Sequence, residues 1–324
     1  MALAEESAKK AAESAAAAAA SAKAAAAAAE AEATAAANVD YVRVCDFDAS
    51  RWVVALNSPS RPVARLVAFH GIGCNHLFFK SWARRFEENN IALAAVCLPG
   101  RLFRLHEKCK SLHEAAWAIV DALSTLAPYP CFLFGHDLGA VVAFEVTKVL
   151  DKHLHVSVAA LVVSAAPSPT LVTVANADRF ETKFFCSSDA DLMERVRVLG
   201  AELDVLSNRN RREMFKFLLP TIRSDYALFE KYAVSKGASQ ISLTAAALSC
   251  PVTAVGAAGD RSCSTDALSA WAAETSSPRV LVHEFNAGGH SYLNLPEKEG
   301  LLLEYLVELC LGKWPTFKAE ECEW

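Results

Sequence analysis

An aspartate lies at the centre of a tight turn between an expected strand and an expected helix. The apolar run 131–134 leads into residues 135–139, which read Gly-His-Asp-Leu-Gly, and a helix-patterned apolar segment follows. A turn this tight leaves no room for a Cβ atom on either side, which accounts for Gly135 and Gly139. Such a strand–turn–helix presents its central side chain, here Asp137, as a nucleophile. A carboxylate with an ordinary pKa of about 3.9 is ionised at neutral pH and needs no base for that role.

Two later motifs add an acid and a histidine in a fixed order. The expected strand 251–255 runs into a glycine-containing loop that ends in Asp260. The expected strand ending at Phe285 continues into a Gly-Gly turn that presents His290. Nucleophile, acid and histidine in this chain order are typical of the α/β-hydrolase fold. Ligands bind at the carboxyl ends of the strands in such sheets, so we expect Asp137, Asp260 and His290 to form one catalytic group.

A loop after an earlier strand supplies the expected oxyanion hole. Residues 69–73 read Phe-His-Gly-Ile-Gly and lie between an expected strand and an expected helix. In this fold, that loop and the residue after the nucleophile each provide a backbone N–H for a developing oxyanion. We therefore expect the backbone amides of Ile72 and Leu138 to form the hole.

The elements that must position these residues alternate along the chain. Strands separated by helices are the pattern of a mainly parallel sheet, and uninterrupted apolar runs indicate strands covered on both faces. We predict an α/β fold, the α/β-hydrolase fold, with a mostly parallel sheet flanked by helices and an inserted helical lid. The expected strands are 42–47, 52–56, 65–69, 91–97, 131–134, 158–164, 251–255 and 280–285. The expected helices are 77–88, 112–126, 138–150, 266–274 and 297–311.

Two regions depart from this alternation. Residues 1–38 are an alanine tract with high helix propensity but no large apolar side chain to anchor it in a core. We expect a low-complexity extension, disordered or a frayed helix, with a partner-binding helix as the alternative. It lacks the apolar core of a signal peptide, and its glutamates count against a transit peptide. The interval of about 170–249 has helical periodicity without strands and is the expected lid within a single domain spanning 39–324.

Composition excludes several classes of function. The 324 residues carry a net charge of −5 without a basic stripe, which argues against nucleic acid as a partner. Beyond the alanine tract, the sequence has no stretch of 18 or more strongly apolar residues, so we expect no membrane span. The ten cysteines include no Cys-x-x-Cys pair, and several lie in apolar runs, so we expect a reducing, cytoplasmic location. We expect a monomer, and no motif predicts a cofactor or a metal.

Further motifs resemble the type II thioesterases that serve fatty acid, polyketide and nonribosomal peptide synthases, and the resemblance spans nearly all of 65–311. Residues 98–107 begin Leu-Pro-Gly-Arg and are similar to a segment of that family. Residues 219–232, which include Arg223, Asp225 and Tyr226, are similar to its lid motif. The Gly-Gly-His segment 288–290 is similar to its catalytic-histidine motif, and Asp260 lies on its acid position.

The resemblance implies a hydrolase that releases acyl groups from thioesters of an acyl carrier protein, pantetheine or CoA. Such carriers are acidic, and we expect that Arg209, Arg211 and Arg212 either meet one or belong to a solvated helix face. The resemblance also implies that Arg223, Asp225 and Tyr226 belong to the lid and substrate region.

The chain departs from that family at Asp137, where the family has Gly-His-Ser-Met-Gly, and at His70-Gly71, where it usually has proline and an aromatic residue. Epoxide hydrolases and haloalkane dehalogenases share the aspartate and the His-Gly loop, although they commonly have tryptophan where this chain has Leu138. Displacement at carbon–oxygen or carbon–halogen bonds is therefore one alternative, with Tyr226 and Tyr232 as lid tyrosines. A non-catalytic acyl-binding or scaffold role is another, and the retained acid and histidine count against it.

Two carboxylates around one imidazole predict an unusual resting charge. They raise the pKa of His290, so the site is expected to hold an imidazolium. Attack of Asp137 on a thioester would give a mixed anhydride and a thiolate. Alternatively, Asp137 and His290 hold a water molecule for direct attack, and the sequence leaves both routes open.

Overall fold

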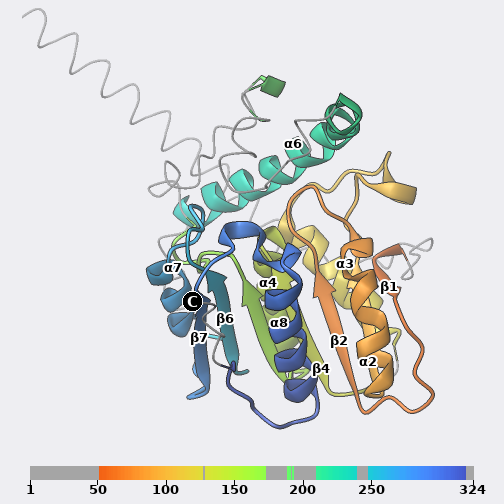
Figure 1. Ribbon diagram of the computed structural model, residues 1–324, viewed down its shortest axis with the longest axis vertical. Helices are drawn as coiled ribbons and strands as arrows, with labels where there is room; N and C mark the ends of the chain where they lie inside the picture. Colours follow the sequence, from red (N-terminus) through yellow and green to blue (C-terminus); the bar gives the residue numbers. More distant parts are fainter. Residues whose placement is uncertain are drawn as a thin grey trace, which may run out of the picture.

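The computed structural model describes residues 51–126, 128–172, 188–190, 192, 209–238 and 247–318 (Figure 1). Within 209–238, side chains are described for 217–233. The expected extension 1–38 and the expected strand 42–47 lie outside these residues, as does much of the interval 170–249.

Seven strands form one sheet in the spatial order β1-β3-β2-β4-β5-β6-β7. They are β1 (Val53–Ala55), β2 (Ala64–Phe69), β3 (Ile91–Val96), β4 (Cys131–His136), β5 (Ala160–Ser164), β6 (Val252–Ala257) and β7 (Val280–Phe285). Among these strands, β1 pairs antiparallel with β3 and every other pairing is parallel. The chain adds β3 on one side of β2 and then β4 on the other, which makes the carboxyl ends of β2 and β4 a topological switch point. The predicted α/β-hydrolase fold with a mostly parallel sheet is confirmed.

Helices cover both faces of this sheet. The α-helices are α2 (Ala83–Glu88), α3 (Leu112–Ser124), α4 (Leu138–Lys148), α6 (Arg209–Ala238), α7 (Thr265–Ser269) and α8 (Pro296–Cys310). Alternate residues of β2 point to opposite faces, so that Leu66 and Ala68 join one apolar cluster while Val67 and Phe69 join the other. Figure 1 shows α2 and α8 on the near face of the sheet, with α3 and α4 behind it. The strands are therefore buried between two layers of helices.

Three expected helices are less regular than their apolar pattern predicts. The segment expected at 77–88 begins as the 3-10 helix η2 (His76–Trp82), which the Asn75 side chain caps by accepting from Leu77 N, and continues as α2. The helix that begins at Leu138 ends in a π-helical turn (Val149–His153). The segment expected at 266–274 is divided into α7 and a 3-10 helix (Ala270–Glu274). Apolar periodicity predicts these segments because it does not distinguish i→i+3, i→i+4 and i→i+5 hydrogen bonding.

Helix α6 crosses above the carboxyl ends of the strands (Figure 1). It lies within the interval expected to form a lid. Thr221 Oγ1 donates to the carbonyl of Gly100 at 2.8 Å, and Tyr232 OH donates to Glu145 Oε1 of α4 at 2.7 Å. These bonds attach α6 to the loop after β3 and to α4. In the described part of the chain, no helix is both long enough and apolar enough to cross a membrane.

Candidate active site

The turn between β4 and α4 holds Asp137 in a backbone conformation that few L-residues adopt. Its φ is 54° and its ψ is −124°. Asp137 N donates to the carbonyl of Ser164 at 2.8 Å. A Cβ atom on Gly135 would lie 2.4 Å from the carbonyl oxygen of Gly139, and one on Gly139 would lie 2.2 Å from that of Phe69. Both glycines are therefore required by close backbone approaches, and the strained aspartate is held over the end of the sheet.

The three residues expected to act together lie together. Asp260 follows β6, and His290 lies in a 3-10 helix (Gly289–Asn294) that follows β7. His290 Nδ1 is 3.0 Å from Asp260 Oδ2, and His290 Nε2 is 3.9 Å from Asp137 Oδ2. The Asp260 side chain is fully buried, whereas Asp137 and His290 keep 23% and 18% of their side-chain surface exposed. The imidazole therefore lies between a buried carboxylate and one that a substrate can reach.

The loop after β2 approaches Asp137 closely. Ile72 N donates to Asp137 Oδ2 at 2.9 Å. A Cβ on Gly71 would lie 3.2 Å from the same oxygen, so glycine permits this approach. The amide expected to bind an oxyanion of the substrate thus binds the carboxylate of Asp137 itself. The other expected donor, Leu138, is the first residue of α4, where backbone N–H groups have no intrahelical acceptor.

The site is charged in its resting state. Burial favours a low pKa for His290, but the negative charges of Asp137 and Asp260 and the hydrogen bond to Asp260 outweigh it and raise that pKa to about 10. Burial favours a high pKa for Asp137, but the positive charge of His290, 3.9 Å away, and the hydrogen bond from the Ile72 amide hold that pKa below its ordinary value. A pKa this high keeps His290 protonated at neutral pH, as an imidazolium beside Asp137 and Asp260.

Ser262 belongs to this group, although the sequence motifs did not indicate it. Its Oγ donates to Asp260 Oδ1 at 2.6 Å and lies 2.8 Å from His290 Nδ1. The backbone N–H groups of Ser262 and Cys263 also donate to Asp260 Oδ1, at 2.8 and 3.2 Å. A serine two residues after an aspartate is a recognisable Asx-turn pattern, and this signal was present in the sequence. These three donors fix the acid that orients the imidazole.

A second histidine lies against the site but does not share its charge. The ring centroids of His136 and His290 are 5.4 Å apart. His136 Nδ1 is 2.8 Å from Ser164 Oγ, which lies 2.7 Å from Tyr292 OH. Burial, followed by the positive charge of His290, lowers the pKa of His136 to about 4. His136 is therefore neutral near pH 7 and is held beside His290 by its hydrogen bond to Ser164.

The residues similar to a lid motif have separate roles in the structure. Asp225 is buried and accepts from Gly73 N at 2.9 Å, while Arg223 Nη2 lies 2.6 Å from Asp189 Oδ1. Tyr226 lies on α6 and is partly buried. Tyr232 is buried and directs its hydroxyl to Glu145. The side chains of the three arginines at 209, 211 and 212 lie outside the described residues.

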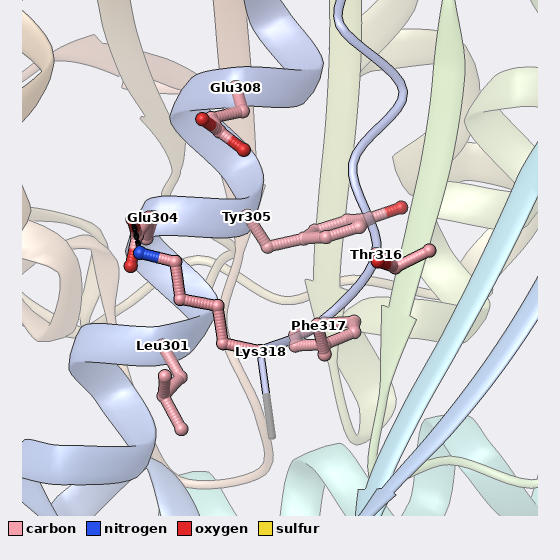
Figure 2. Close-up of a pocket in the computed structure, with 7 residues that line it drawn as sticks. All are labelled: Leu301, Glu304, Tyr305, Glu308, Thr316, Phe317 and Lys318. Carbon is pink, nitrogen blue, oxygen red and sulfur yellow. Dashed lines mark hydrogen bonds and ion pairs between the residues drawn. The ribbon is translucent and has the colours of Figure 1, made fainter. Parts of the chain in front are cut away.

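The hollow in Figure 2 does not belong to this site. Its volume of about 10 Å³ has room for one water molecule at most. It is lined by Leu301, Glu304, Tyr305, Glu308, Thr316, Phe317 and Lys318. Phe317 stacks on Tyr305 with the ring centroids 4.3 Å apart, so the hollow is a packing gap between α8 and the segment that follows it. Among the residues that the structure describes, no group of His, Cys, Asp and Glu side chains is arranged to hold a metal ion.

A mostly parallel sheet flanked by helices, with these loops at its carboxyl edge, defines an α/β-hydrolase. Residues 64–309 match the thioesterase domain family, and the chain belongs to that family. The resemblance to thioesterases is thereby confirmed, and the chain is a thioesterase-like hydrolase.

Individual relatives agree with this assignment. Thioesterase PikA5 from Streptomyces venezuelae is 28% identical over 78% of this chain and 83% of its own length. The type II thioesterase BorB from the borrelidin biosynthetic cluster is 26% identical with a TM-score of 0.66, over 81% of this chain and 97% of its own. The RedJ thioesterase from the prodiginine pathway of Streptomyces coelicolor is 28% identical with a TM-score of 0.64, over 78% and 92%.

Proposed function

We propose that this hydrolase releases acyl groups from carrier-bound thioesters through a covalent intermediate on Asp137. The proposal rests on the hydrogen bond from Ile72 N to Asp137 Oδ2. His290 Nε2 lies 3.9 Å from the same oxygen. This arrangement leaves Oδ1 as the attacking atom. It also places an oxyanion donor on the Asp137 carboxyl group rather than on the substrate.

The first step is attack by the ionised carboxylate. Asp137 Oδ1 bonds to the thioester carbonyl carbon, with the Leu138 amide assigned to the substrate oxygen, and the carbon–sulfur bond breaks. A thiolate with a pKa of about 8.5 takes a proton from the His290 imidazolium. The products are a free thiol and a mixed anhydride. The anhydride lies several kcal/mol uphill, so the Leu138 amide must stabilise the tetrahedral oxyanion that precedes it.

The second step uses the charge that the first step removes. Once Asp137 is acylated, one of the two carboxylates that raise the pKa of His290 is neutral, so that pKa falls. Neutral His290 then takes a proton from water, and the hydroxide attacks Cγ of Asp137. The negative charge of the tetrahedral intermediate develops on Oδ2, where the Ile72 amide already lies. The acyl group leaves as a carboxylate, and Asp137 loses its remaining proton to solvent.

Direct attack by a water molecule is less well supported by these charges. That route needs a base that is unprotonated yet basic near neutral pH. The pKa of Asp137 lies below its ordinary value, which makes its carboxylate a weak base. The pKa of His290 is raised to about 10, which keeps the imidazole protonated. A nucleophilic carboxylate therefore suits the site better than a water-activating pair.

A carrier protein remains the proposed partner. Leu102, Phe103 and Leu105, in the loop after β3, and Phe217 and Leu218, on α6, are exposed apolar side chains. They support a surface that receives the carrier and its acyl arm. A monomer in a reducing compartment also remains a proposal, and the seven cysteines that the structure describes are free thiols.

The test is a single turnover in water enriched in heavy oxygen, using a panel of acyl-pantetheine thioesters. We expect thiol release by the wild type and its loss in Asp137→Ala. After one turnover, mass spectrometry of the peptide containing Asp137 should find the heavy oxygen in its carboxylate. Heavy oxygen only in the released acid would instead indicate attack at the acyl carbon.

Displacement at a carbon–oxygen or carbon–halogen bond is the second candidate. It is favoured by the same Ile72 contact, because attack on a saturated carbon requires no oxyanion donor for the substrate. The hydroxyl of Tyr232 bonds to Glu145 and is not directed to Asp137, which weakens its role as a ring-opening acid. A folded wild type that hydrolyses epoxides or haloalkanes but releases no thiol would favour this candidate. Turnover of neither substrate class would favour the acyl-binding role.

A further inference from the structure

We infer that Asp225 of α6 is a positioning residue that holds the oxyanion loop. The position of α6 and the direction of the Ile72 N–H group are thereby coupled. This loop consists of residues 70–74. The inference rests on the proposed function for its kinetic consequence, but its structural basis is independent of the reaction.

Asp225 joins two separate segments through a buried carboxylate. Its Oδ2 accepts from Gly73 N at 2.9 Å, and its Oδ1 accepts from Arg101 Nη2 in the loop after β3. The side chains of Asp225 and Arg101 are 2% and 4% exposed. An ion pair excluded from water to this degree has few alternative partners, so its geometry is strongly specified. The helix is thereby fixed to the residue that directly follows Ile72.

The adjoining contacts leave the loop little freedom. Gly73 has a φ of 71°, and a Cβ there would lie 2.7 Å from Ile222 Cγ1 of α6. The helix thus both bonds to Gly73 and packs against it. Ile72 N, one residue earlier, is directed at Asp137 Oδ2. Displacement of α6 would therefore change the distance from the Ile72 amide to the carboxylate of Asp137.

Arg101 fixes the other end of the same loop. Its Nη1 lies 3.5 Å from His70 Nε2, and His70 Nδ1 lies 2.9 Å from the carbonyl of Gly71. Burial and the charge of Arg101 lower the pKa of His70 to about 3, so this imidazole is neutral near pH 7. An imidazole that carries its proton on Nδ1 donates to Gly71 and accepts at Nε2. Residues 70 and 73 are therefore both tied to one buried ion pair.

The consequence falls on the second chemical step. In the proposed mechanism, the Ile72 amide stabilises the oxyanion formed at Asp137 Cγ when water attacks. Weakening the Asp225–Gly73 bond should therefore slow breakdown of the acyl-enzyme more than its formation. A residue that only stabilises the fold would lower the fraction of active enzyme without changing this ratio.

Two double variants isolate the hydrogen bond from the charge. Arg101→Gln/Asp225→Asn and Arg101→Gln/Asp225→Leu both lack the ion pair, and their residues at 225 have nearly equal size. Only the asparagine variant keeps an acceptor for Gly73 N. We expect acyl-enzyme breakdown to be on the order of 10²-fold slower in the leucine variant than in the asparagine variant, as for loss of an oxyanion donor. Thr221→Val is the matched control, because it breaks the bond from α6 to Gly100 without touching residues 70–74.

A measurement without substrate separates this inference from the proposed function. In the wild type, NMR should find the Gly73 amide proton shifted downfield and protected from hydrogen exchange, as expected for a buried bond to a carboxylate. That protection should persist in Thr221→Val and in the asparagine variant but not in the leucine variant. An unprotected Gly73 amide in the wild type overturns the inference even if neither double variant folds. Protection without any acyl-enzyme would leave the loop contact standing and overturn both the proposed mechanism and the kinetic role of Asp225.

Discussion

At the scale of single residues, the candidate site is defined by a carboxylate that accepts a hydrogen bond from the amide proposed as an oxyanion donor. A hydroxyl nucleophile would leave the Ile72 amide for the substrate, whereas Asp137 Oδ2 accepts from it at 2.9 Å. The same carboxylate, with Asp260, raises the pKa of His290 to about 10. One side chain therefore changes both the anion-binding capacity of the loop and the resting charge of the imidazole.

Replacing Asp137 with serine should raise thioester hydrolysis. The substitution releases the Ile72 amide for the substrate oxygen and removes one of the two carboxylates that raise the pKa of His290, so that the imidazole becomes a better base near neutral pH. We expect thiol release to increase roughly tenfold or more, since one oxyanion donor contributes about 10²–10³-fold. The measurement is thiol release from acyl-pantetheine at pH 7, with Asp137→Ala as the inactive control. Turnover at or below the wild-type rate would show that the Ile72 amide does not stabilise the substrate oxyanion when serine is the nucleophile.

Ser262→Ala should slow turnover, because it removes a hydroxyl that contacts both Asp260 and His290. The hydroxyl donates to Asp260, which leaves its oxygen to accept from His290 Nδ1–H. Its loss leaves Asp260 as the remaining acceptor for His290 Nδ1–H and orients the imidazole less firmly, so kcat should fall by about tenfold, the usual order for a charge-assisted hydrogen bond. Asp260 keeps two backbone donors, so the fold should be retained. The pH dependence of kcat checks this, with Ser262→Thr as the variant that keeps the hydroxyl. Identical profiles for the alanine and threonine variants would contradict it.

At the scale of elements, apolar pattern and glycine spacing predict most of what positions the site. β2 and β4 are central strands buried on both faces, so their apolar runs are unambiguous, and the turn that holds Asp137 is marked by glycines that a Cβ would exclude. The contact of Ile72 with Asp137 was not predictable in the same way, because it depends on the direction of one side chain across two loops. The partners of Asp225 were hidden for a similar reason: the motif shows that an acid is present but not that it bonds to Gly73.

The turn between β4 and α4 gives a prediction with an internal control. Gly139→Ala would place a Cβ 2.2 Å from the backbone oxygen of Phe69, in a sheet that cannot readily move away. We expect a loss of about 2–3 kcal/mol in the free energy of unfolding, the upper range for overpacking. Gly300→Ala, in α8, meets no atom within 4 Å and should instead gain about 0.5–1 kcal/mol. Urea unfolding of both variants measures the difference, and equal effects would show that β2 and α4 are not in close backbone contact.

At the scale of the whole molecule, the buried histidines predict a maximum of stability near pH 6.5. The pKa of His290 is raised from 6.5 to about 10, so the folded chain holds a proton that the unfolded chain releases. Its contribution is fully present below pH 6.5 and is lost as the pH rises towards 10. The pKa values of His70 and His136 are lowered to about 3 and 4. The unfolded chain therefore gains protons that these side chains cannot bind in the fold, and stability is lost as the pH falls below 6.5.

Asp137→Asn tests which group causes the alkaline loss. It removes one of the carboxylates that raise the pKa of His290, so the decline between pH 7 and 9 should become shallower while the decline below pH 6.5 persists. The buried thiols, whose pKa values burial raises, add to the loss above pH 9, which is why the comparison ends there. Urea unfolding of both proteins from pH 4 to 9 provides the measurement. A wild type of constant stability between pH 7 and 9 would mean that no imidazolium is retained in the fold. The charge pattern on which both steps of the proposed reaction depend would then be wrong.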